Sequence, residues 1–320
     1  MRVARRAGVL IATVLAAAAF GHVFFTVTAT EREGTPLTTT ITGTPAWMVD
    51  VFIHQNFGET TGRRYNQHRD PCVPLCPQYG PGPVAQMVRE RVPVDLSLLL
   101  GALLIGTAVG VAGGRFCATH DGRRRTRVLH TATALQLSSP VLLQSLLVLF
   151  YFSSNASEFI RLPFLSGQGQ YVPFSEDPLL FLRAMWLPWL LAAAPLAAFT
   201  LRLTEVHMRE DLQEDFIRTA RAKGLSERQV VNRHALPIAG PAIAAMTGVN
   251  VSTLLINIAI IEYAYNIPGL FRVINSAVRS PADIPVLEAL VIEGVVLVVL
   301  ANALADAVQY RLDPRVRMSR

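Results

Sequence analysis

Long apolar runs constrain this chain more than any other feature. Six stretches of about 20 mainly apolar residues follow one another: roughly Ala7–Ala29, Val94–Gly114, Thr131–Phe152, Met185–Leu203, Pro241–Glu262 and Pro285–Gln309. Such a stretch is long enough to cross a bilayer, and lipid offers the backbone no hydrogen-bond partner, so each span must be a helix. Only 16% of the 320 residues are charged, against about 25% in soluble domains. We expect an all-α integral membrane protein with six transmembrane helices.

The first run follows Arg2, Arg5 and Arg6, as the apolar part of a secretory signal would. It is longer than the usual apolar core of a signal peptide, and five more spans follow. We therefore expect an uncleaved first transmembrane helix.

Basic residues predict the orientation of the spans. Arginines concentrate before the first run, after the second, after the fourth and in the C-terminal tail. Six spans place all four segments on one side, which the positive-inside rule makes the cytoplasm. Both termini are expected there. Because the arginines are spread over separate loops, the net charge of +6 indicates topology and not nucleic-acid binding.

The segment between the first two spans, residues 31–93, is expected outside and contains Cys72 and Cys76. These cysteines are candidates for a disulfide, since an external location permits one. A metal site with His68 and Asp70 is the alternative. C-x3-C lacks the second ligand pair of a structural zinc site, which favours a local disulfide or two free thiols, so no metal is expected. Cys117, at a helix end, is expected to be an inert small residue.

A charged block, DFIRTARAKGLSERQVVNRHALP, lies at residues 215–237 between the fourth and fifth runs. Its spacing predicts a first helix from about Arg209 to Lys223, with an apolar stripe of Leu212, Phe216 and Ala220 and with Ile217 beside it. Charge follows the helix dipole, with acidic residues early and basic residues late.

Gly224 then predicts a left-handed stop for this first helix. Ser226 and Gln229 form a capping box for a second helix, with Leu225 and Val230 at the hydrophobic-staple positions. Pro237 marks where this second helix ends or bends. A loop lying on lipid headgroups is one interpretation. The second interpretation is a rigid elbow that docks on a partner. The capping residues at both helices favour it, because a simple tether between two spans does not need them.

The spacing of Ala220, Gly224 and then Leu236-Pro237 resembles the EAA loop of ATP-binding-cassette importer permeases. The sequence of the block is especially similar to that of the dipeptide/oligopeptide/nickel permease family. The resemblance continues in four further stretches: NFGET (Asn56–Thr60), VRERVP (Val88–Pro93), IEYAYNIPGL (Ile261–Leu270) and ANALADAVQYRLDPRVR (Ala301–Arg317).

The resemblance implies the helical bundle of type I importers. Residues 1–30 would form the N-terminus and first span, residues 31–93 the external segment, and residues 94–320 the core permease domain with its coupling loop at 207–240. It also implies a bacterial inner-membrane location and a docking contact with an ATPase. The residues assigned to that contact are Asp215, Phe216, Arg218, Ala220, Arg221, Gly224, Leu225, Leu236 and Pro237.

The resemblance further implies four kinds of partner: a second related permease, two cytoplasmic ATPase subunits or domains, an external substrate-binding protein and the lipid membrane. The residues support a separate motor. A P-loop needs Gly-x-x-x-x-Gly-Lys-Ser/Thr, and the only lysine is Lys223, which precedes Gly224. No cofactor is expected in this chain, with ATP and Mg²⁺ bound by the partner ATPases.

Polar residues inside the apolar runs are candidates for a translocation path. They lie in the third span, the fifth span and the sixth span, and comprise Gln136, Ser139, Gln144, Asn250, Thr253, Asn257 and Glu293. Hydrogen bonding between helices is the alternative, and both roles keep polar groups away from lipid. Glu293 is suited to a peptide ammonium or to an arginine of a partner subunit.

We expect a permease subunit of an ATP-driven importer for di- or oligopeptides, which is not itself an enzyme. Two alternatives belong to other classes. An ion-coupled secondary transporter acting alone often has inverted repeats, and no clear repeat is visible. An intramembrane hydrolase needs a nucleophile and a base in mutual reach, and no serine within the spans has an evident histidine partner. The sequence leaves peptide length, or nickel as cargo, open.

Overall fold

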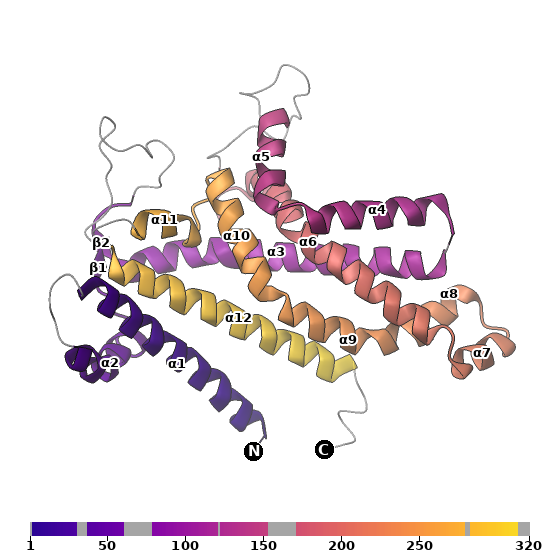
Figure 1. Ribbon diagram of the computed structural model, residues 1–320, viewed down its shortest axis with the longest axis horizontal. Helices are drawn as coiled ribbons and strands as arrows, with labels where there is room; N and C mark the ends of the chain where they lie inside the picture. The colour runs from indigo at the N-terminus through magenta and orange to yellow at the C-terminus, as the bar shows by residue number, and fades with distance from the viewer. Residues whose placement is uncertain are drawn as a thin grey trace. The chain divides into compact units, whose positions relative to one another are not determined.

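The computed structural model describes residues 2–30, 37–60, 79–120, 122–152, 171–278 and 282–312. The chain forms two compact units. Unit 1 combines Met1–Leu96 with Ile267–Val299, and unit 2 combines Ser97–Asn266 with Leu300–Arg320. Helices α3 (Val84–Thr119) and α12 (Ile284–Leu312) contribute to both (Figure 1). Each unit joins segments that are distant in sequence, whereas the three predicted domains are consecutive ranges. The predicted domain boundaries at residues 30 and 93 therefore stay a prediction.

Unit 1 is built on the first two helices and on the N-terminal parts of two longer ones. Its elements are α1 (Arg2–Thr30), α2 (Leu37–Phe52), the first part of α3, the 3₁₀ turn η2 (Phe271–Val273), α11 (Ile274–Ala277) and the first part of α12. Helices α1 and α2 pack together. Strands β1 (Glu59–Thr60) and β2 (Gly82–Pro83) pair antiparallel, with Glu59 opposite Pro83. A buried apolar cluster joins Val84 and Met87 to Leu270 and Val286.

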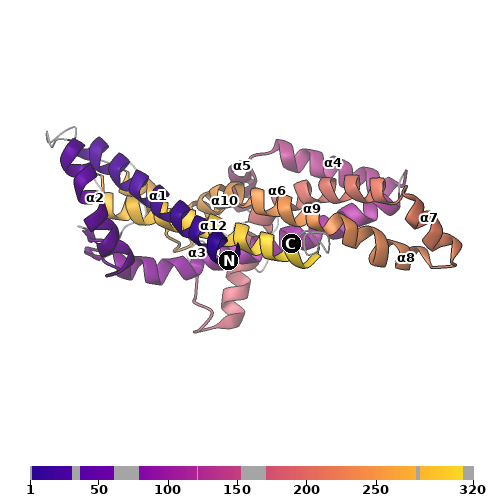
Figure 2. The ribbon, with the colours of Figure 1, turned by 90° about the horizontal axis from the view of Figure 1, so that it is seen from below.

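Unit 2 is a helical bundle around α6. It contains the rest of α3, α4 (Arg124–Ser138), α5 (Val141–Phe152), α6 (Pro178–Asp211), α7 (Asp215–Ala222), α8 (Glu227–Val230), the π-helix η1 (Val231–Ala235), α9 (Leu236–Val249), α10 (Val251–Tyr265) and the end of α12. Helix α6 contacts α4, α5, α9 and α10. Helices α7 and α8 project at one end of this unit (Figures 1 and 2).

Four helices in the described part of the chain are long and apolar enough to cross a membrane: Gly8–Thr28, Val84–Thr119, Pro178–Asp211 and Ile284–Arg311. They coincide with the first, second, fourth and sixth predicted spans. Two bent helix pairs raise the number to six if each pair counts as one span. The remaining two predicted spans fall on these bent pairs.

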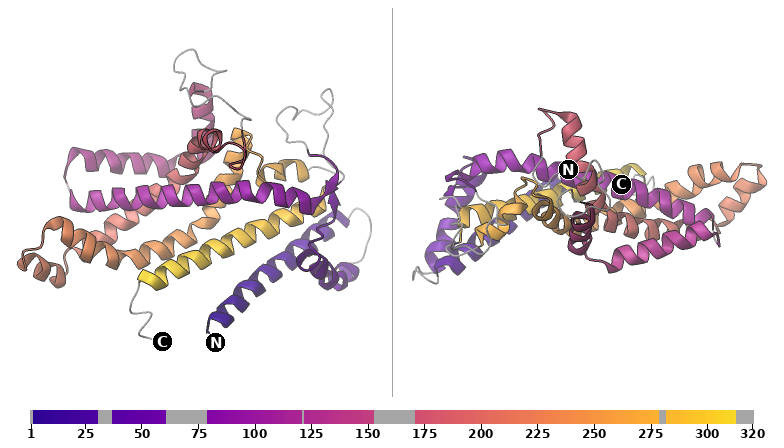
Figure 3. Two further views of the ribbon diagram at one scale, coloured as in Figure 1. Left: turned by 180° about the vertical axis from the view of Figure 1, so that it is seen from behind. Right: turned by 90° about the horizontal axis from the view of Figure 1, so that it is seen from above.

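The third predicted span is not one straight helix. Helices α4 and α5 meet at an angle of 104°, so that α5 turns away from α4 (Figures 1 and 3). The break falls at Ser139, which is extended (φ −106°, ψ 124°), and Pro140. A residue before proline avoids the helical region because the proline ring clashes with it. Pro140 therefore ends α4, where the sequence had predicted one uninterrupted span.

The fifth predicted span is also bent, but less sharply than the third. Helices α9 and α10 meet at 49° around Asn250, whose side-chain amide donates to the Met246 carbonyl at 2.8 Å. The same carbonyl also accepts the Asn250 backbone N–H at 3.2 Å, so Asn250 closes the end of α9 with both its backbone and its side chain.

Glycines on α3 allow α6 to approach closely. A Cβ on Gly110 would lie 2.9 Å from the Ala197 carbonyl oxygen and 2.5 Å from Thr200 Cβ. Gly106, one turn earlier, is similarly close to Ala193 and Leu196. Gly106 and Gly110 thus form a small-xxx-small step, in which small residues let membrane helices make backbone contact.

Candidate functional site

The charged block forms an elbow, defined here as residues 215–237. Helix α6 continues to Asp211, so the predicted helix from Arg209 to Lys223 is in fact the end of α6 followed by a turn and then α7. Gly224 ends α7 with φ +80°, and its N–H donates to the Arg221 carbonyl at 2.9 Å. The predicted left-handed glycine stop is therefore confirmed, because this conformation is easy only for glycine.

The start of α8 is fixed by the predicted capping box. The Ser226 backbone N–H donates to Gln229 Oε1 at 3.0 Å, and the Ser226 hydroxyl donates to the same oxygen at 2.8 Å. Leu225 and Val230 belong to one apolar cluster, as a hydrophobic staple requires. The turn between the two helices is thus held by local interactions that the sequence specifies.

The inner face of the elbow packs on the helical bundle of unit 2. Ile217 and Val230 are completely buried, and Ala220 is nearly so. They form one cluster with Met208 near the end of α6, and Val111 and Ala118 of α3 pack against it. Outside this cluster, the Arg115 guanidinium of α3 donates to Asn232 Oδ1 at 2.8 Å. The elbow is therefore held against two long helices.

The predicted apolar stripe was wrong at one position. Phe216 is exposed (41%), whereas Ile217 beside it is buried (0%). Residues one apart point about 100° away from each other on a helix, so only one of them can face the bundle. Helix α7 begins at Asp215 and not at Arg209, so it does not continue the rotation of α6. The contacts of Ile217 and Ala220 with the bundle determine which face of α7 is buried. The exposed aromatic ring of Phe216 is left on the outer face.

The outer face of the elbow carries charges of both signs. The Arg221 guanidinium donates to both carboxylate oxygens of Glu227, at 2.7 and 3.1 Å. This pair lowers the pKa of the Glu227 carboxyl from its ordinary value. Arg218 lies 3.4 Å from the carboxylate of Asp215. Both pairs are exposed to solvent, where ion pairs contribute only about 0.2–1 kcal/mol, so they are available to a partner.

Pro237 does not end the second helix of the elbow. The chain passes through the π-helix η1 and continues directly into α9, with Leu236 partly buried and Pro237 exposed. The Leu236 N–H donates to the Val231 carbonyl, five residues back. Since proline has no N–H to donate to the carbonyl four residues earlier, a wider π turn accommodates it.

The polar residues of the third predicted span bond to one another. Gln136 Nε2 donates to Gln144 Oε1 at 3.1 Å, and Gln144 Nε2 donates to the Ser139 carbonyl at 3.0 Å. The bonds bridge the break between α4 and α5. They favour the helix-bonding alternative for these residues.

The polar residues of the fifth predicted span are placed differently. Thr253 is exposed on α10, and Asn257 is partly buried one turn later. The Asn250 side chain donates to the Met246 carbonyl of α9, at the bend between α9 and α10. Thr253 therefore points away from the interior of unit 2, and the role of these three residues stays a prediction.

Acidic residues of unit 1 are buried to an extent that the sequence did not indicate. Glu293 is 6% exposed, and its carboxyl interacts with that of Asp95. Glu288 accepts from Trp47 Nε1 at 3.0 Å and lies 2.7 Å from His22 Nδ1. Glu288 thus joins α1, α2 and α12.

Two motifs of the resemblance, NFGET and VRERVP, lie in unit 1 with the end of a third, IEYAYNIPGL. Asp283 accepts hydrogen bonds from Thr60, at the end of NFGET, and from Tyr79. Arg91, within VRERVP, donates to the Gly269 carbonyl at 3.2 Å, and Asp95 accepts from the Leu270 N–H at 2.8 Å. Segments far apart in sequence are therefore tied together at two places, Asp283 and the IPGL stretch. Cys72, Cys76, His68 and Asp70 lie outside the described residues, so the disulfide prediction stays open.

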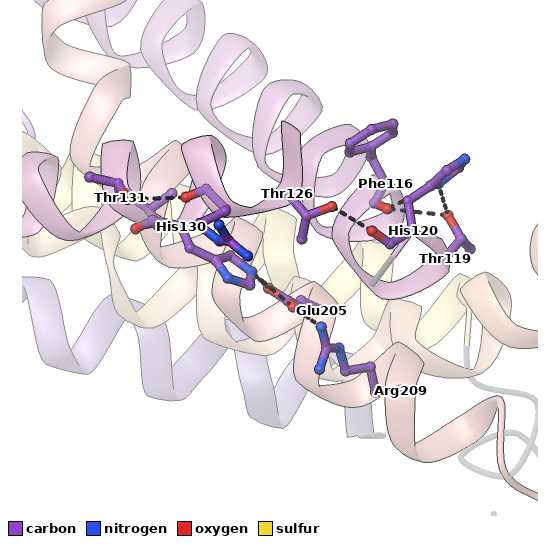
Figure 4. Close-up of polar contacts among 10 residues, drawn as sticks. Phe116, Thr119, His120, Thr126, His130, Thr131, Glu205 and Arg209 are labelled. Atoms are coloured by element: carbon purple, nitrogen blue, oxygen red, sulfur yellow. Dashed lines mark hydrogen bonds and ion pairs between the residues drawn. The ribbon is translucent and has the colours of Figure 1, made fainter. Parts of the chain in front are cut away.

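Sequence reasoning missed a polar cluster between α3, α4 and α6. His130 Nε2 lies 2.9 Å from Glu205 Oε2, and Arg209 Nη2 lies 2.8 Å from Glu205 Oε1 (Figure 4). Cys117, fully buried on α3, has its thiol beside them. No spacing rule connects residues 117, 130 and 205, because they come from three different helices.

These features define a multi-pass helical membrane protein with a packed, charged elbow between two of its apolar helices. Residues 110–318 match the family described as binding-protein-dependent transport system inner membrane component, and the chain belongs to this family. The resemblance to peptide-type importer permeases and the type I importer permease fold are thereby confirmed.

Individual relatives agree with the family assignment. The chain is 34% identical over 236 residues to a Brucella abortus protein named as a peptide transport system permease, covering 73% of this chain and 72% of that one. It is 30% identical to the dipeptide transport system permease protein of Lactococcus lactis subsp. cremoris, covering 74% and 73%. A Sinorhizobium fredii protein named as a peptide ABC transporter permease is 29% identical, covering 73% and 72%.

Family membership makes the chain a transporter subunit of the inner membrane and not an enzyme. It works with a substrate-binding partner and an ATPase partner. The ion-coupled transporter acting alone and the intramembrane hydrolase are not supported.

Proposed function

We propose that this chain is the permease subunit of an ATP-driven peptide importer and that the elbow transmits the motion of a separate ATPase to the membrane helices. The observation that carries the proposal is the division of the elbow into a buried inner face and a charged outer face. A segment packed on α3 and α6 moves with them, so a force on its outer face reaches helices long enough to cross the membrane.

The ATPase site belongs to other chains in this proposal. ATP and Mg²⁺ would bind there, because the single lysine, Lys223, does not stand in a P-loop. On the outer face the contact residues would be Asp215, Phe216, Arg218 and Arg221, all of them exposed. Ala220, Leu225 and Leu236 would act by holding the elbow against the bundle, and Gly224 and Pro237 by setting its shape.

The complex would contain a second related permease, two ATPase subunits or domains and an external substrate-binding protein. The elbow and both termini would face the cytoplasm, in agreement with the arginine distribution. Peptides are the proposed cargo because the relatives are named for peptide transport. The positions proposed to line the path are Asn250, Thr253 and Asn257, whereas Gln136 and Gln144 are assigned to packing between α4 and α5.

Site-directed cross-linking tests the elbow contact. We expect a cysteine at Phe216, in a chain whose native cysteines are replaced by serine, to cross-link to the ATPase in the assembled complex. A cysteine at Ile217 is the matched control, because this neighbour is buried against the bundle and should form no such product. Adducts with lipid alone from position 216, with no ATPase product, would contradict the proposal.

A further inference from the structure

The cluster of Cys117, His130 and Glu205 has a chemistry that the importer function does not use. The thiol, one imidazole nitrogen and one carboxylate oxygen all lie within 4.8 Å of one another. They come from α3, α4 and α6 of unit 2 (Figure 1), and Figure 4 shows His130 and Glu205 pointing toward each other. Cys117 is fully buried and the Glu205 side chain is 10% exposed, whereas the His130 side chain is 44% exposed. The cluster is therefore enclosed on one side and reachable from solvent on the other.

We propose that Cys117, His130 and Glu205 form a Zn²⁺ site that ties α3, α4 and α6 together. Sulfur, nitrogen and oxygen donors of these three types are the ones zinc takes in proteins. Zinc–ligand distances of about 2.0–2.3 Å place tetrahedral ligand atoms about 3.3–3.8 Å apart. The ligand atoms here bracket that spacing, since His130 Nε2 and Glu205 Oε2 are 2.9 Å apart and the whole set lies within 4.8 Å. Water occupies the fourth position.

Arg209 is compatible with the site and has a defined role in it. Its guanidinium lies 2.8 Å from Glu205 Oε1, which leaves Oε2 for the metal. Ligating carboxylates are commonly hydrogen-bonded from outside the coordination sphere, and such partners orient them. Zinc replaces the direct contact between His130 and Glu205 Oε2. The Cys117 thiol gives up its proton to solvent, since only a thiolate ligates the metal.

Cobalt substitution tests the proposal directly. The chain has three cysteines, so Cys72→Ser with Cys76→Ser leaves Cys117 as the only thiol of this chain. We expect Co²⁺ added to the purified complex of this variant to give a sulfur-to-cobalt charge-transfer band and tetrahedral visible bands. Zn²⁺ should remove both bands, and excess Mg²⁺ should not, because magnesium prefers oxygen ligands. Cys117→Ser in the same background should abolish the charge-transfer band.

Two ligand variants and one control complete the test. We expect His130→Gln and Glu205→Gln each to weaken Zn²⁺ affinity at least tenfold, since even outer partners of ligands contribute about 10–100-fold. His207→Gln is the control. His207 also lies on α6 but pairs with Glu210 at 3.7 Å, so its loss should leave the affinity unchanged. Zn²⁺ should raise the thermal stability of the parent background and of His207→Gln, and not that of Cys117→Ser. Absence of a thiolate band, or equal affinity in the ligand variants, would overturn the proposal.

Discussion

Gly224 sets the direction of the chain between α7 and α8. Its φ of +80° lies in the left-handed region, which costs other L-residues about 1–2 kcal/mol. A Cβ at this position would touch nothing within 4 Å. The glycine is therefore required for the backbone conformation and not for space.

We expect Gly224→Ala to distort the elbow and to lower ATP-coupled uptake while the chain still inserts in the membrane. Gly122→Ala is a matched control, because Gly122 has φ +75° and equally open surroundings in the loop between α3 and α4. Both substitutions should introduce similar strain. The measurement is peptide uptake per assembled complex in proteoliposomes. An equal loss of uptake in the two variants would show that strain, and not the elbow, is responsible.

At the scale of elements, α7 has two faces with different roles. Ile217 and Ala220 face the bundle, whereas Phe216, Arg218 and Ala222 face solvent. Sequence periodicity predicted an amphipathic helix correctly, yet it oriented the helix from a start at Arg209. The orientation changed because the turn after Asp211 separates α7 from α6. Contacts with Met208 then select Ile217 for the inner face.

We expect Ala220→Asp to detach α7 from the bundle, because an unpaired buried carboxylate costs several kcal/mol. Ala222→Asp, two residues later on the exposed side of the same helix, should cost less than about 0.5 kcal/mol. Thermal unfolding of the purified protein compares the two. ATP-coupled uptake should be lost in the first variant only. Unchanged stability and uptake in well-expressed Ala220→Asp would refute the assigned packing.

At the scale of the whole molecule, the chain supplies membrane helices and an elbow, and the proposed energy source lies in another chain. The single lysine, Lys223, follows Ala222 and not the glycine that a P-loop has at this point, in agreement with the proposal. Cargo selection in the proposal also depends on a separate external protein.

We expect proteoliposomes containing the permeases alone to accumulate no labelled peptide. Addition of the ATPase, the substrate-binding protein and MgATP should start uptake, and an ATPase variant unable to hydrolyse ATP serves as the control. Dipeptides and longer peptides are compared in the same assay. Uptake that follows an ion gradient without nucleotide would contradict the proposed mechanism.

The sequence by itself determined the features that depend on local rules. Apolar length predicted helices at all six runs, because backbone groups in lipid must bond within their own segment. Gly224, Ser226 and Gln229 predicted the elbow turn, since their interactions span only three or four residues. The EAA spacing predicted the family, because all of its matching residues lie within one short segment.

Only the tertiary structure decided which distant residues meet. The convergence of Cys117, His130 and Glu205 depends on α3, α4 and α6 becoming neighbours. The burial of Glu293 beside Asp95 and the bond of Glu288 to Trp47 likewise join separate helices. The 104° break at Pro140 was also undetermined, because a proline sets where a helix is interrupted, whereas packing sets the direction in which the chain continues. Contacts between helices carry no fixed sequence spacing, so periodicity does not predict them.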